Sequence, residues 1–438
     1  MPRSVVPALL AGVICSSLGA QIQPPAIHTG GFVNGSASRA SLTPDRVIVR
    51  FRGAVDVRSV SALALGAGVE LVDQGRNGEF HVFRCEPALV DVMVAWFAEQ
   101  PGVEYAERDG LVHTTVAPND TYWSLQWNFF NAGAPSGTSV SNWGVNGEAA
   151  WSTTAGANIT VAILDTGVAY ENFGSFQTAP DLVGRTFVSP LDAVAGDGHP
   201  NDENSHGTHV AGTIGQVTNN SLGCAGLAHA CSIMPVRVLD ASGSGSHAQI
   251  ANGLTHATAN GAKVVNMSLS GSTGSTTLSN AVTSTANAGL TICAAAGNTG
   301  RKGVQYPALY SQCIAVGATR FDGTKPRYST TGTGLDVMAP GGDTSVDQNG
   351  DGYADGILQQ TFASGAPTSF GYYFFQGTSM ATPHVAAIAA MVRAAHGPGY
   401  TAAQVRAAIE NTCRDRGTVG YDQTYGFGIV AAAAAAIY

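Results

Sequence analysis

The sequence has few charged residues, no excess of basic side chains and no closely spaced pair of cysteines. Charged residues make up 12% of the 438 positions, and 30 acidic against 21 basic side chains give a formal net charge of -9. Such a chain offers no basic patch for nucleic acid or for an anionic membrane, so we expect neither partner. Without a CxxC pair, a structural zinc site is not indicated.

Long hydrophobic runs are also missing after the first 20 residues. Those residues, MPRSVVPALLAGVICSSLGA, place one arginine before an apolar run and small residues before Gln21. This order is typical of a secretory signal peptide over 1–20, and the run is shorter than the roughly 20 residues that span a bilayer. We therefore expect a secreted, extracellular protein. A membrane anchor, or a lipoprotein modified at Cys15, is the alternative that this segment leaves open.

Apolar residues, at 44%, and glycines, numbering 55, are abundant instead. This composition allows a sizeable core and two or three domains. Residues 21–44, rich in Gly, Ser, Pro and Ala, look like a linker. Strand patterns at 46–52 and 81–87, and a helix followed by a strand over 88–109, predict a small α+β unit over 45–112.

A second domain, over 116–438, begins at the segment VAPND, 116–120, which contains a Pro-Asn-Asp turn, so that residues 21–115 form the N-terminal region. From about residue 158 onward, strand and helix patterns alternate along the chain. This order predicts an α/β fold with a mainly parallel sheet and helices on both of its faces. In such folds the chemistry is expected in the loops at the carboxyl ends of the strands.

Three short segments at such positions carry an acid, a base and a nucleophile. They are VAILDTGV with Asp165, NSHGTHVAG with His206 and QGTSMATPHVAA with Ser379. A serine hydroxyl attacks a carbonyl only when a base takes its proton, and that base needs a third group to fix its tautomer. Each residue alone is more often a cap or a buried polar group, but the three types together predict a catalytic triad. His209 and His384 follow triad members within helices, and we expect both to be structural.

These segments, their order and their wide spacing resemble the motifs of the subtilisin-like serine proteases, over about residues 117–438. The resemblance implies a subtilisin-like three-layer fold and a serine-type endopeptidase that hydrolyses protein and peptide substrates through an acyl-enzyme; we expect a monomer. Ser379 would be the nucleophile, His206 the general base and Asp165 its orienting partner. AAAGNTG is similar to the segment that donates a side-chain amide to the oxyanion, which gives this role to Asn298.

The same resemblance gives the N-terminal unit a role. VEYAERD at 103–109 is similar to part of the propeptide that precedes these enzymes, which helps folding and acts as an intramolecular inhibitor. We expect the enzyme to remove it by its own cleavage between about Asp109 and Asn119. An accessory domain retained in the mature enzyme is the alternative. Two other function classes stay open: a relative that transfers the acyl group to an amine and makes cyclic peptides, and an inactive peptide-binding module.

Two further segments are expected to contact the substrate. LDASGSGSHA and NMSLSG resemble the extended segments between which the peptide lies as an added strand, and they contain Gly243, Ser244, Gly245, Ser268, Leu269 and Ser270. Main-chain pairing implies broad specificity. Ser270 stands where the family usually has Gly at the wall of the primary pocket, and Gln305 stands where a small residue often forms its floor. Both departures put the usual preference for large apolar residues in doubt.

Two calcium sites are expected. In DQNGDGYADG, positions 1, 3, 5 and 9 of a calcium loop are occupied by Asp347, Asn349, Asp351 and Asp355. Position 12 is Leu358 rather than Glu, so the loop is not a complete EF-hand, and a solvated acidic turn is the alternative. The second site rests on the resemblance, which implies a calcium held by Asp120, Asp181 and Asn220, with Asn219 as the alternative to Asn220.

Six cysteines follow the signal peptide, and export would permit disulfides. Cys224 and Cys231 flank one turn, while Cys293 and Cys313 begin two neighbouring strands of the alternating pattern. We expect these two pairs to form bridges. Under this scheme Cys413 stays unpaired in the mature enzyme, and the sixth, Cys85, leaves with the propeptide.

Overall fold

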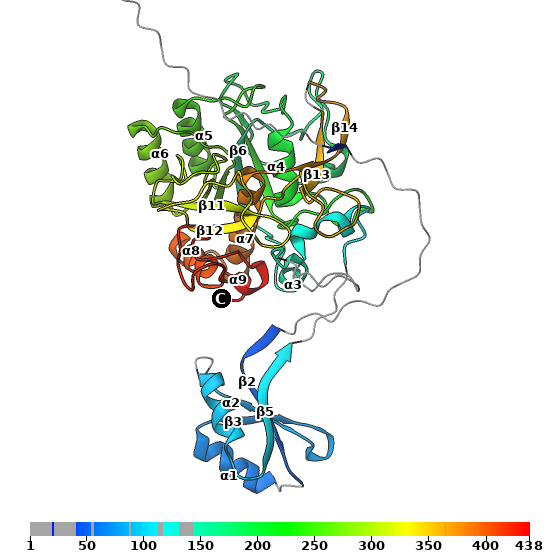
Figure 1. The fold of residues 1–438 in the computed structure, drawn as a ribbon, viewed down its shortest axis with the longest axis vertical. Helices are drawn as coiled ribbons and strands as arrows, with labels where there is room; N and C mark the ends of the chain where they lie inside the picture. The colour runs from blue at the N-terminus through cyan, green and yellow to red at the C-terminus, as the bar shows by residue number, and fades with distance from the viewer. Residues whose placement is uncertain are drawn as a thin grey trace, which may run out of the picture. The chain divides into compact units, whose positions relative to one another are not determined.

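The computed structural model describes residues 20–21, 41–53, 57–86, 89–111, 117–130, 143–363 and 365–438. The chain divides into two compact units, one of residues 37–115 and one of residues 1–36 and 116–438 (Figure 1). Almost all of the expected signal peptide and most of the expected linker lie outside the described residues.

The smaller unit is a four-stranded antiparallel sheet with two helices, α1 (Val57–Ala67) and α2 (Val90–Ala98). The strands lie in the order β3-β4-β2-β5, with bounds Ser41–Phe51 (β2), Glu70–Gln74 (β3), His81–Arg84 (β4) and Val103–Leu111 (β5). Val47 and Val49 alternate along β2 and are fully buried with Phe83 and Phe97 in one core. The strand and helix patterns therefore build a unit with its own core.

Two elements of this unit were not expected from the sequence, α1 and β3. None of the residues of β3 is fully buried, and α1 places only Val60 and Ala64 in the core. With so few core residues, neither segment shows a clear apolar period. The strand β2 also begins at Ser41, inside the expected linker, rather than at residue 46.

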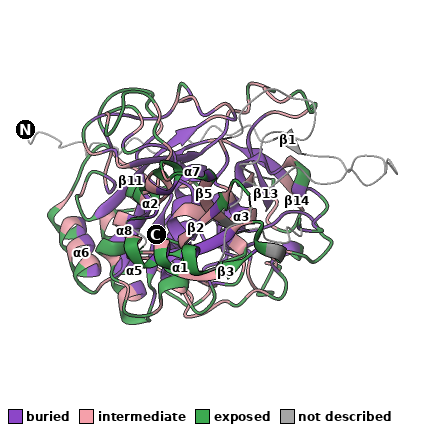
Figure 2. Cartoon of the chain, turned by 90° about the horizontal axis from the view of Figure 1, so that it is seen from below, coloured by how far each residue is buried: buried purple, intermediate pink, exposed green. Residues whose placement is uncertain are grey.

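A seven-stranded parallel sheet forms the centre of the larger unit. The strand order is β12-β11-β10-β9-β6-β8-β7. The bounds are Thr160–Asp165 (β6), Leu191–Asp192 (β7), Ser232–Arg237 (β8), Val264–Met267 (β9), Thr291–Ala295 (β10), Cys313–Thr319 (β11) and Val337–Pro340 (β12). All residues of β9 to β12 are buried (Figure 2), as a sheet covered on both faces requires. The expected α/β fold with a parallel sheet is confirmed.

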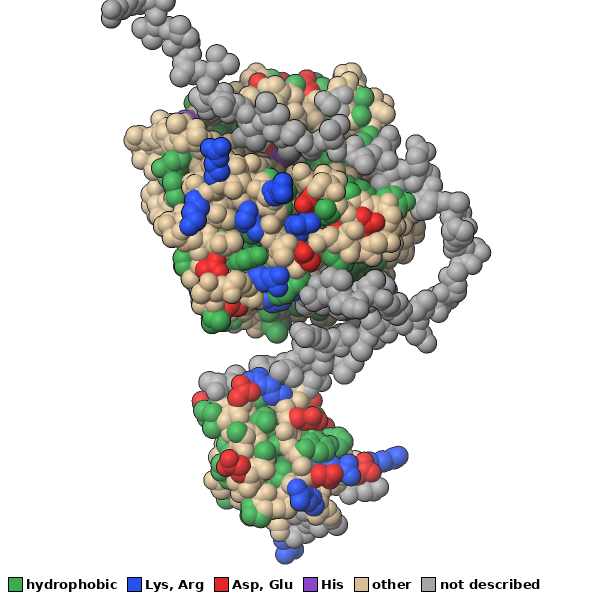
Figure 3. Space-filling model, in the orientation of Figure 1, with side chains coloured by type: hydrophobic (Ala, Val, Ile, Leu, Met, Phe, Trp, Pro, Cys, Tyr) green, Lys and Arg blue, Asp and Glu red, His purple; other side chains and the backbone are tan. Residues whose placement is uncertain are grey.

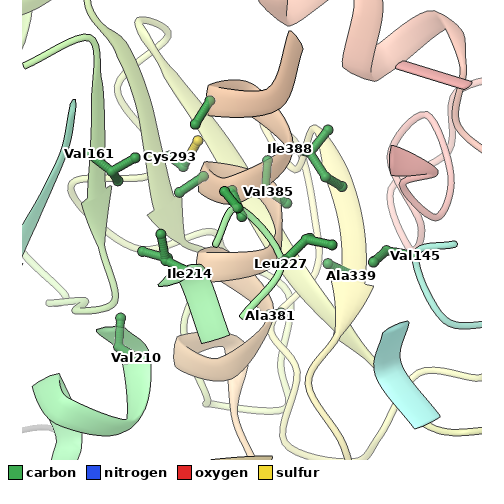
Figure 4. Packing of buried hydrophobic residues seen from close by; sticks show 14 of the residues in the cluster. Val145, Val161, Val210, Ile214, Leu227, Cys293, Ala339, Ala381, Val385 and Ile388 are labelled. Atoms are coloured by element: carbon green, nitrogen blue, oxygen red, sulfur yellow. The ribbon is translucent and has the colours of Figure 1, made fainter. Parts of the chain in front are cut away.

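Helices cover the sheet on both faces. On one face α7 (Thr378–His396) packs on β9 to β12 and beside α4 (His206–Gly215), and Val385, Ile388 and Ile214 share one core cluster there (Figure 4). On the other face α5 (His247–Ala259) and α6 (Thr276–Asn287) lie side by side over a second cluster. Three further α-helices of this unit are α3 (Gly147–Trp151), α8 (Ala402–Asn411) and α9 (Ala432–Ala436). Among the helices described, none has the length and apolar content of a membrane span.

An antiparallel ribbon packs against α4 beside the main sheet. It consists of β13 (Ile357–Phe362) and β14 (Phe370–Phe375), with β1 (Ala20–Gln21) added to β14. The sequence did not predict this ribbon. Leu358, which occupies position 12 of the expected calcium loop, is a fully buried residue of β13.

The disulfide expected between Cys293 and Cys313 is wrong, because both are free thiols. In the parallel register of β10 and β11, Cys293 lies opposite Ile314, and Cys313 lies opposite Ile292. Successive side chains of a strand point to opposite faces. The thiol of Cys293 therefore packs in the α7 layer (Figure 4), whereas that of Cys313 packs in the α5–α6 layer. A bridge between them would have to pass through the sheet.

The second expected disulfide, Cys224 to Cys231, is also wrong. Cys224 packs with Tyr122 and Phe374 in a small cluster next to β14. Cys231 lies in the main core instead, where its Sγ is 3.8 Å from Nη2 of Arg185. The two thiols face different parts of the core. Cys85 and Cys413 are free as well.

Candidate active site

Asp165 and His206 meet at the carboxyl end of β6. Asp165 is the last residue of that strand and is fully buried, and His206 is the first residue of α4. Nδ1 of His206 donates a hydrogen bond of 2.7 Å to Oδ1 of Asp165, which fixes the ring orientation and leaves Nε2 as the acceptor in the neutral imidazole. Gly207 makes this approach possible, because a Cβ there would collide with the carbonyl oxygen of Gly167.

Asp202 is a fully buried carboxylate that no sequence motif marks. One of its oxygens accepts the N–H groups of Asn204 (2.9 Å) and Ser205 (3.1 Å), directly before the catalytic helix. Ser205 has a left-handed backbone with φ of 91°, and its carbonyl accepts a hydrogen bond of 2.6 Å from Thr361 of β13. Burial raises the pKa of Asp202, while hydrogen bonds from Thr208, Asn204 and Thr166 oppose the rise. Hydrogen bonds to Asp202 and from Thr361 thus fix the segment that leads to His206.

Ser379 lies in the first turn of α7 and is 5% exposed. Its hydroxyl donates a hydrogen bond of 3.1 Å to the carbonyl of Ser268, and the hydroxyl of Ser268 donates one of 2.8 Å to the carbonyl of Ser379. This exchange joins the start of α7 to the segment that follows β9. Because α4 packs against α7, the helix that carries His206 and the helix that carries Ser379 adjoin.

Two N–H donors face one small space beside Ser379. Oδ1 of Asn298 accepts hydrogen bonds of 2.9 Å from both the N–H and the hydroxyl of Thr378, which orients the amide of Asn298. A Cβ placed on Gly377 would lie 3.5 Å from Nδ2 of Asn298 and 3.5 Å from the N–H nitrogen of Ser379. Glycine keeps this space open, and its φ of 151° also favours glycine. Two converging donors of this kind can bind a carbonyl oxygen that becomes negatively charged.

A second group of side chains lies between the segments that adjoin Ser379. The hydroxyl of Ser270 donates a hydrogen bond of 2.9 Å to Oε1 of Gln305. The side chain of Gln305 also packs on Gly297, the residue before Asn298. Gln305 therefore connects the 268–270 segment to the 296–298 segment.

The segment of Gly243, Ser244 and Gly245 forms a turn that Asp240 closes. The backbone of Asp240 pairs with the backbone of Ser244 (2.8 Å) and Gly243 (2.9 Å). Nδ2 of Asn204 donates to the carbonyl of Ala241 (2.9 Å) and lies 3.6 Å from the position of a Cβ on Gly243. This turn thus adjoins the loop before His206, and Leu269 is buried in the second core cluster.

Three of the expected calcium ligands are close together. Oδ2 of Asp120 accepts the N–H of Asn219 (2.8 Å), and Nδ2 of Asn220 donates to Oδ1 of Asp181 (2.7 Å). Burial raises the pKa of Asp181 to about 6, and the charge of Asp120 adds to the rise. Oδ1 of Asp120 is buried with no hydrogen-bond partner among the described residues. A buried, unpartnered carboxylate oxygen beside a second carboxylate fits a hard cation such as Ca²⁺.

The loop of Asp347, Asn349 and Asp351 is held by its own backbone. Asp347 accepts the N–H groups of Gly350 (2.7 Å) and Gly352 (3.1 Å), and Asn349 and Asp351 each accept one N–H two residues further on. Burial raises the pKa of Asp355 to about 7, and the charges of Asp347 and Asp351 add to the rise. Within the described ranges, no three His, Cys, Asp or Glu side chains converge as a metal-binding group.

An oriented acid–base pair, a serine at a helix start and two converging N–H donors define the class of the serine hydrolases. The model of the subtilase family, Peptidase_S8, matches residues 156–428. The chain belongs to this family and is a serine-type endopeptidase, so the alternative of an inactive peptide-binding module is wrong.

Proteins of similar sequence include thermitase of Thermoactinomyces vulgaris. It is 43% identical over 263 residues, which cover 60% of this chain and 84% of thermitase. Subtilisin E of Bacillus subtilis is 34% identical over 422 residues, 94% of this chain and 96% of that protein. An extracellular protease of Xanthomonas campestris is 34% identical over 398 residues, 82% of this chain and 62% of that protein. Among solved structures, a protease from Pseudoalteromonas arctica superposes with a TM-score of 0.64 at 30% identity, over 74% of this chain and 99% of that chain.

Proposed function

We propose that this endopeptidase cleaves proteins through an acyl-enzyme on Ser379, with His206 as general base and Asp165 as its orienting partner. The observation that carries the proposal is the 2.7 Å bond from His206 to a fully buried Asp165, at the same sheet edge as a serine flanked by two N–H donors. Asp165 would orient the ring of His206 and stabilise the imidazolium that forms.

The reaction begins when the Ser379 hydroxyl turns from the carbonyl of Ser268 toward Nε2 of His206. Oγ bonds to the substrate carbonyl carbon while its proton passes to Nε2, and the oxyanion is held by Nδ2 of Asn298 and the N–H of Ser379. Collapse of this tetrahedral intermediate breaks the C–N bond of the substrate, and His206 protonates the leaving amine. Water then attacks the ester with His206 as base, which releases the acid and restores Ser379.

The peptide would lie between the turn of Gly243, Ser244 and Gly245, beside the His206 loop, and the segment of Ser268, Leu269 and Ser270, beside Ser379. Gln305 would close the primary pocket, since it bridges the two segments next to Ser379. Main-chain pairing in such a groove accepts many sequences.

We also propose that the enzyme is made as a pre-pro-protein, that it is secreted, and that it removes its propeptide by its own cleavage. The compact unit of residues 37–115 has its own core and would act as the intramolecular inhibitor. Residues 112–116, in the expected cleavage region, lie outside the described residues. A Ser379→Ala precursor should therefore keep its propeptide when it is expressed alone.

Calcium is proposed as a structural ion in two places. Asp120, Asp181 and Asn220 would hold one ion, because they supply hard oxygen donors and one of them is buried without a partner. The loop of Asp347, Asn349, Asp351 and Asp355 would hold another. A bound ion would neutralise the neighbouring carboxylates and restrain the loop; it takes no part in the proton transfers.

The decisive experiment is labelling by an organophosphorus reagent followed by peptide mapping. We expect the label on Ser379, together with loss of peptide cleavage in Ser379→Ala by several orders of magnitude. Ser152→Ala is the matched control, because Ser152 is an exposed serine that only donates to the carbonyl of Ala149. Peptide cleavage by Ser379→Ala at the wild-type rate would refute the mechanism. Cyclic or amine-extended products in place of hydrolysed ones would favour the acyl-transfer alternative.

A further inference from the structure

Exposed basic side chains of the larger unit are concentrated in one place. In its described residues, four Lys or Arg side chains are exposed, namely Lys263, Arg301, Lys302 and Arg327. Three of them, which we name the basic strip, are Arg301, Lys302 and Arg327. Figure 3 shows that Lys and Arg side chains gather on one face of this unit. The acidic net charge of the chain gave no indication of this local group of cations.

The basic strip lies on two loops that are bonded to each other. Gly300 donates its N–H to the carbonyl of Tyr328 (2.6 Å), Gly303 donates to Thr331 (2.7 Å) and Thr331 donates to Arg301 (3.1 Å). A Cβ on Gly300 would even collide with the carbonyl oxygen of Arg327. The backbones of the two loops are thus in contact, so Arg301, Lys302 and Arg327 project from adjacent stretches of the chain.

This area adjoins the catalytic centre. Arg301 is three residues after Asn298, whose amide faces the space beside Ser379. The second loop is tied to the same segment, since Thr330 donates its N–H to the carbonyl of Gly297 (3.0 Å). The two loops that carry the basic strip are thus tied through their backbone to the segment of Gly297 and Asn298.

The cations of the basic strip have no carboxylate partner among the described residues. The acidic side chains nearby are engaged elsewhere. Asp322 accepts hydrogen bonds from Thr324 and from Gln348, and Asp336 pairs with Arg406 at 2.6 Å. Among the described residues, no ion pair therefore balances the three cations of the strip.

We propose that the basic strip makes this enzyme favour acidic polypeptides, cleaving bonds that have Asp or Glu within a few residues of the scissile bond. The proposal rests on the function proposed above. Residues 116–438 contain 19 acidic and 12 basic side chains, and this acidic excess repels acidic substrates at long range, whereas an unpaired cluster of cations attracts carboxylates locally. Screening at about 0.1 M salt limits this attraction to roughly 10 Å, so it acts only on residues close to the cleaved bond.

The chain offers a matched pair of variants. Lys302→Glu reverses a charge in the basic strip, and Lys263→Glu reverses another exposed charge, directly before β9. Lys263 is at the amino ends of the parallel strands, the opposite edge from the catalytic residues. Both variants change the net charge by the same amount, so only the position of the charge differs. Arg327→Glu tests the second loop, and the melting temperature verifies that each variant is folded.

The substrate preference can be measured with three peptides that share one cleavable core. The residues that flank this core are Glu in the first peptide, Gln in the second and Lys in the third. For the wild type at low ionic strength we expect kcat/KM for the Glu peptide to exceed that for the Lys peptide by roughly ten-fold or more. Lys302→Glu should reduce this ratio by roughly three- to ten-fold, while Lys263→Glu should leave it unchanged. The ratio should fall toward one at high salt for the wild type.

Equal ratios in the wild type and both variants would overturn the proposal for the basic strip, provided that the Gln peptide is cleaved. An equal loss of the ratio in Lys302→Glu and Lys263→Glu would also overturn it, because net charge rather than position would then be responsible. Failure of the wild type to cleave the Gln peptide would refute the proposed function, and the strip proposal with it.

Discussion

The carboxylate of Asp202 accepts two hydrogen bonds from Thr208, one from its N–H at 2.9 Å and one from its hydroxyl at 2.6 Å. The other carboxylate oxygen accepts the hydroxyl of Thr166 at 2.8 Å, directly after Asp165. A single buried side chain therefore joins the strand end that carries Asp165 to the helix that carries His206, the proposed general base.

Asp202→Asn should impair catalysis more than substrate binding. The substitution keeps the shape but replaces one acceptor oxygen by a donor, so part of the network is lost. We expect kcat to fall by roughly ten- to a hundred-fold with KM nearly unchanged, and the free energy of unfolding to fall by about 2–4 kcal/mol. Steady-state kinetics and denaturant unfolding measure the two effects.

Asp422→Asn provides the control for this prediction. Asp422 accepts the N–H groups of Thr418, Thr424 and Tyr425 in a loop after α8, so its loss should affect local stability and leave kcat unchanged. A destabilised Asp202→Asn enzyme with normal kcat would show that Asp202 serves stability alone.

Asn298→Ala should lower kcat by about 10²–10³-fold, the size that removal of such a donor has in a subtilisin itself. The donor acts on charge that develops in the transition state, so KM should change little. Asn260→Ala is the matched control, since that amide only donates within the end of α5. Equal kinetics of the two variants would remove Asn298 from the oxyanion site.

Protonation of the buried His384 should make the folded enzyme less stable at acidic pH. Its Nδ1 donates to the carbonyl of Met380 and its Nε2 accepts from Nδ2 of Asn128, both at 2.8 Å, which requires a neutral ring. Burial lowers the pKa of His384 from 6.5 to about 4. Between these values the unfolded chain binds more protons than the folded one, so stability is complete above pH 6.5 and is lost as the pH falls toward 4.

The loss is up to about 3 kcal/mol, because one pKa unit corresponds to about 1.4 kcal/mol. Chemical unfolding of the inactive Ser379→Ala mature form at several pH values would measure it. His384→Gln should flatten the dependence between pH 6.5 and 4, whereas His396→Gln, at an exposed position at the end of α7, should not. The same slope in all three proteins would contradict the assignment.

Removal of calcium should lower the melting temperature more than it changes kcat/KM on short peptides. An ion that binds only the folded state stabilises it by about 2.7 kcal/mol at a hundred times its dissociation constant. Asp120→Ala should remove the part of the response due to the first site, and Asp347→Ala with Asp351→Ala the part due to the loop. A melting temperature unaffected by long dialysis against chelator would rule out both sites.

The sequence predicted the features that local patterns determine. Each strand of the parallel sheet is a short apolar run, and Asp165, His206 and Ser379 follow such runs or open helices, so their motifs can be read one by one. Asp202 was missed because its importance lies in contacts with residues on both sides of it and across the fold. The basic strip was missed because a net charge averages over the chain and says nothing of where the cations gather.

The prediction of the two disulfides was wrong for a different reason. Neighbouring strands brought Cys293 and Cys313 close, as expected, but a register in which Cys293 lies opposite Ile314 puts the two thiols on opposite faces. A shift of one residue in register reverses which face a side chain occupies, and the sequence pattern of two fully buried strands contains no alternation that reports the register. The sequence pattern did not predict the β13–β14 ribbon, because the residues of the ribbon follow directly on the segment that resembles a calcium loop.

The helix α7 has a consequence for the timing of activity. It carries Ser379 in its first turn and supplies much of the central core, yet it comes more than 170 residues after His206 in the chain. During synthesis Asp165 and His206, the proposed orienting acid and base, are made early, while Ser379, the proposed nucleophile, and the helix that packs the core are made late. The growing chain therefore has no means of hydrolysing neighbouring nascent proteins, or itself, until nearly the whole peptidase unit has left the ribosome.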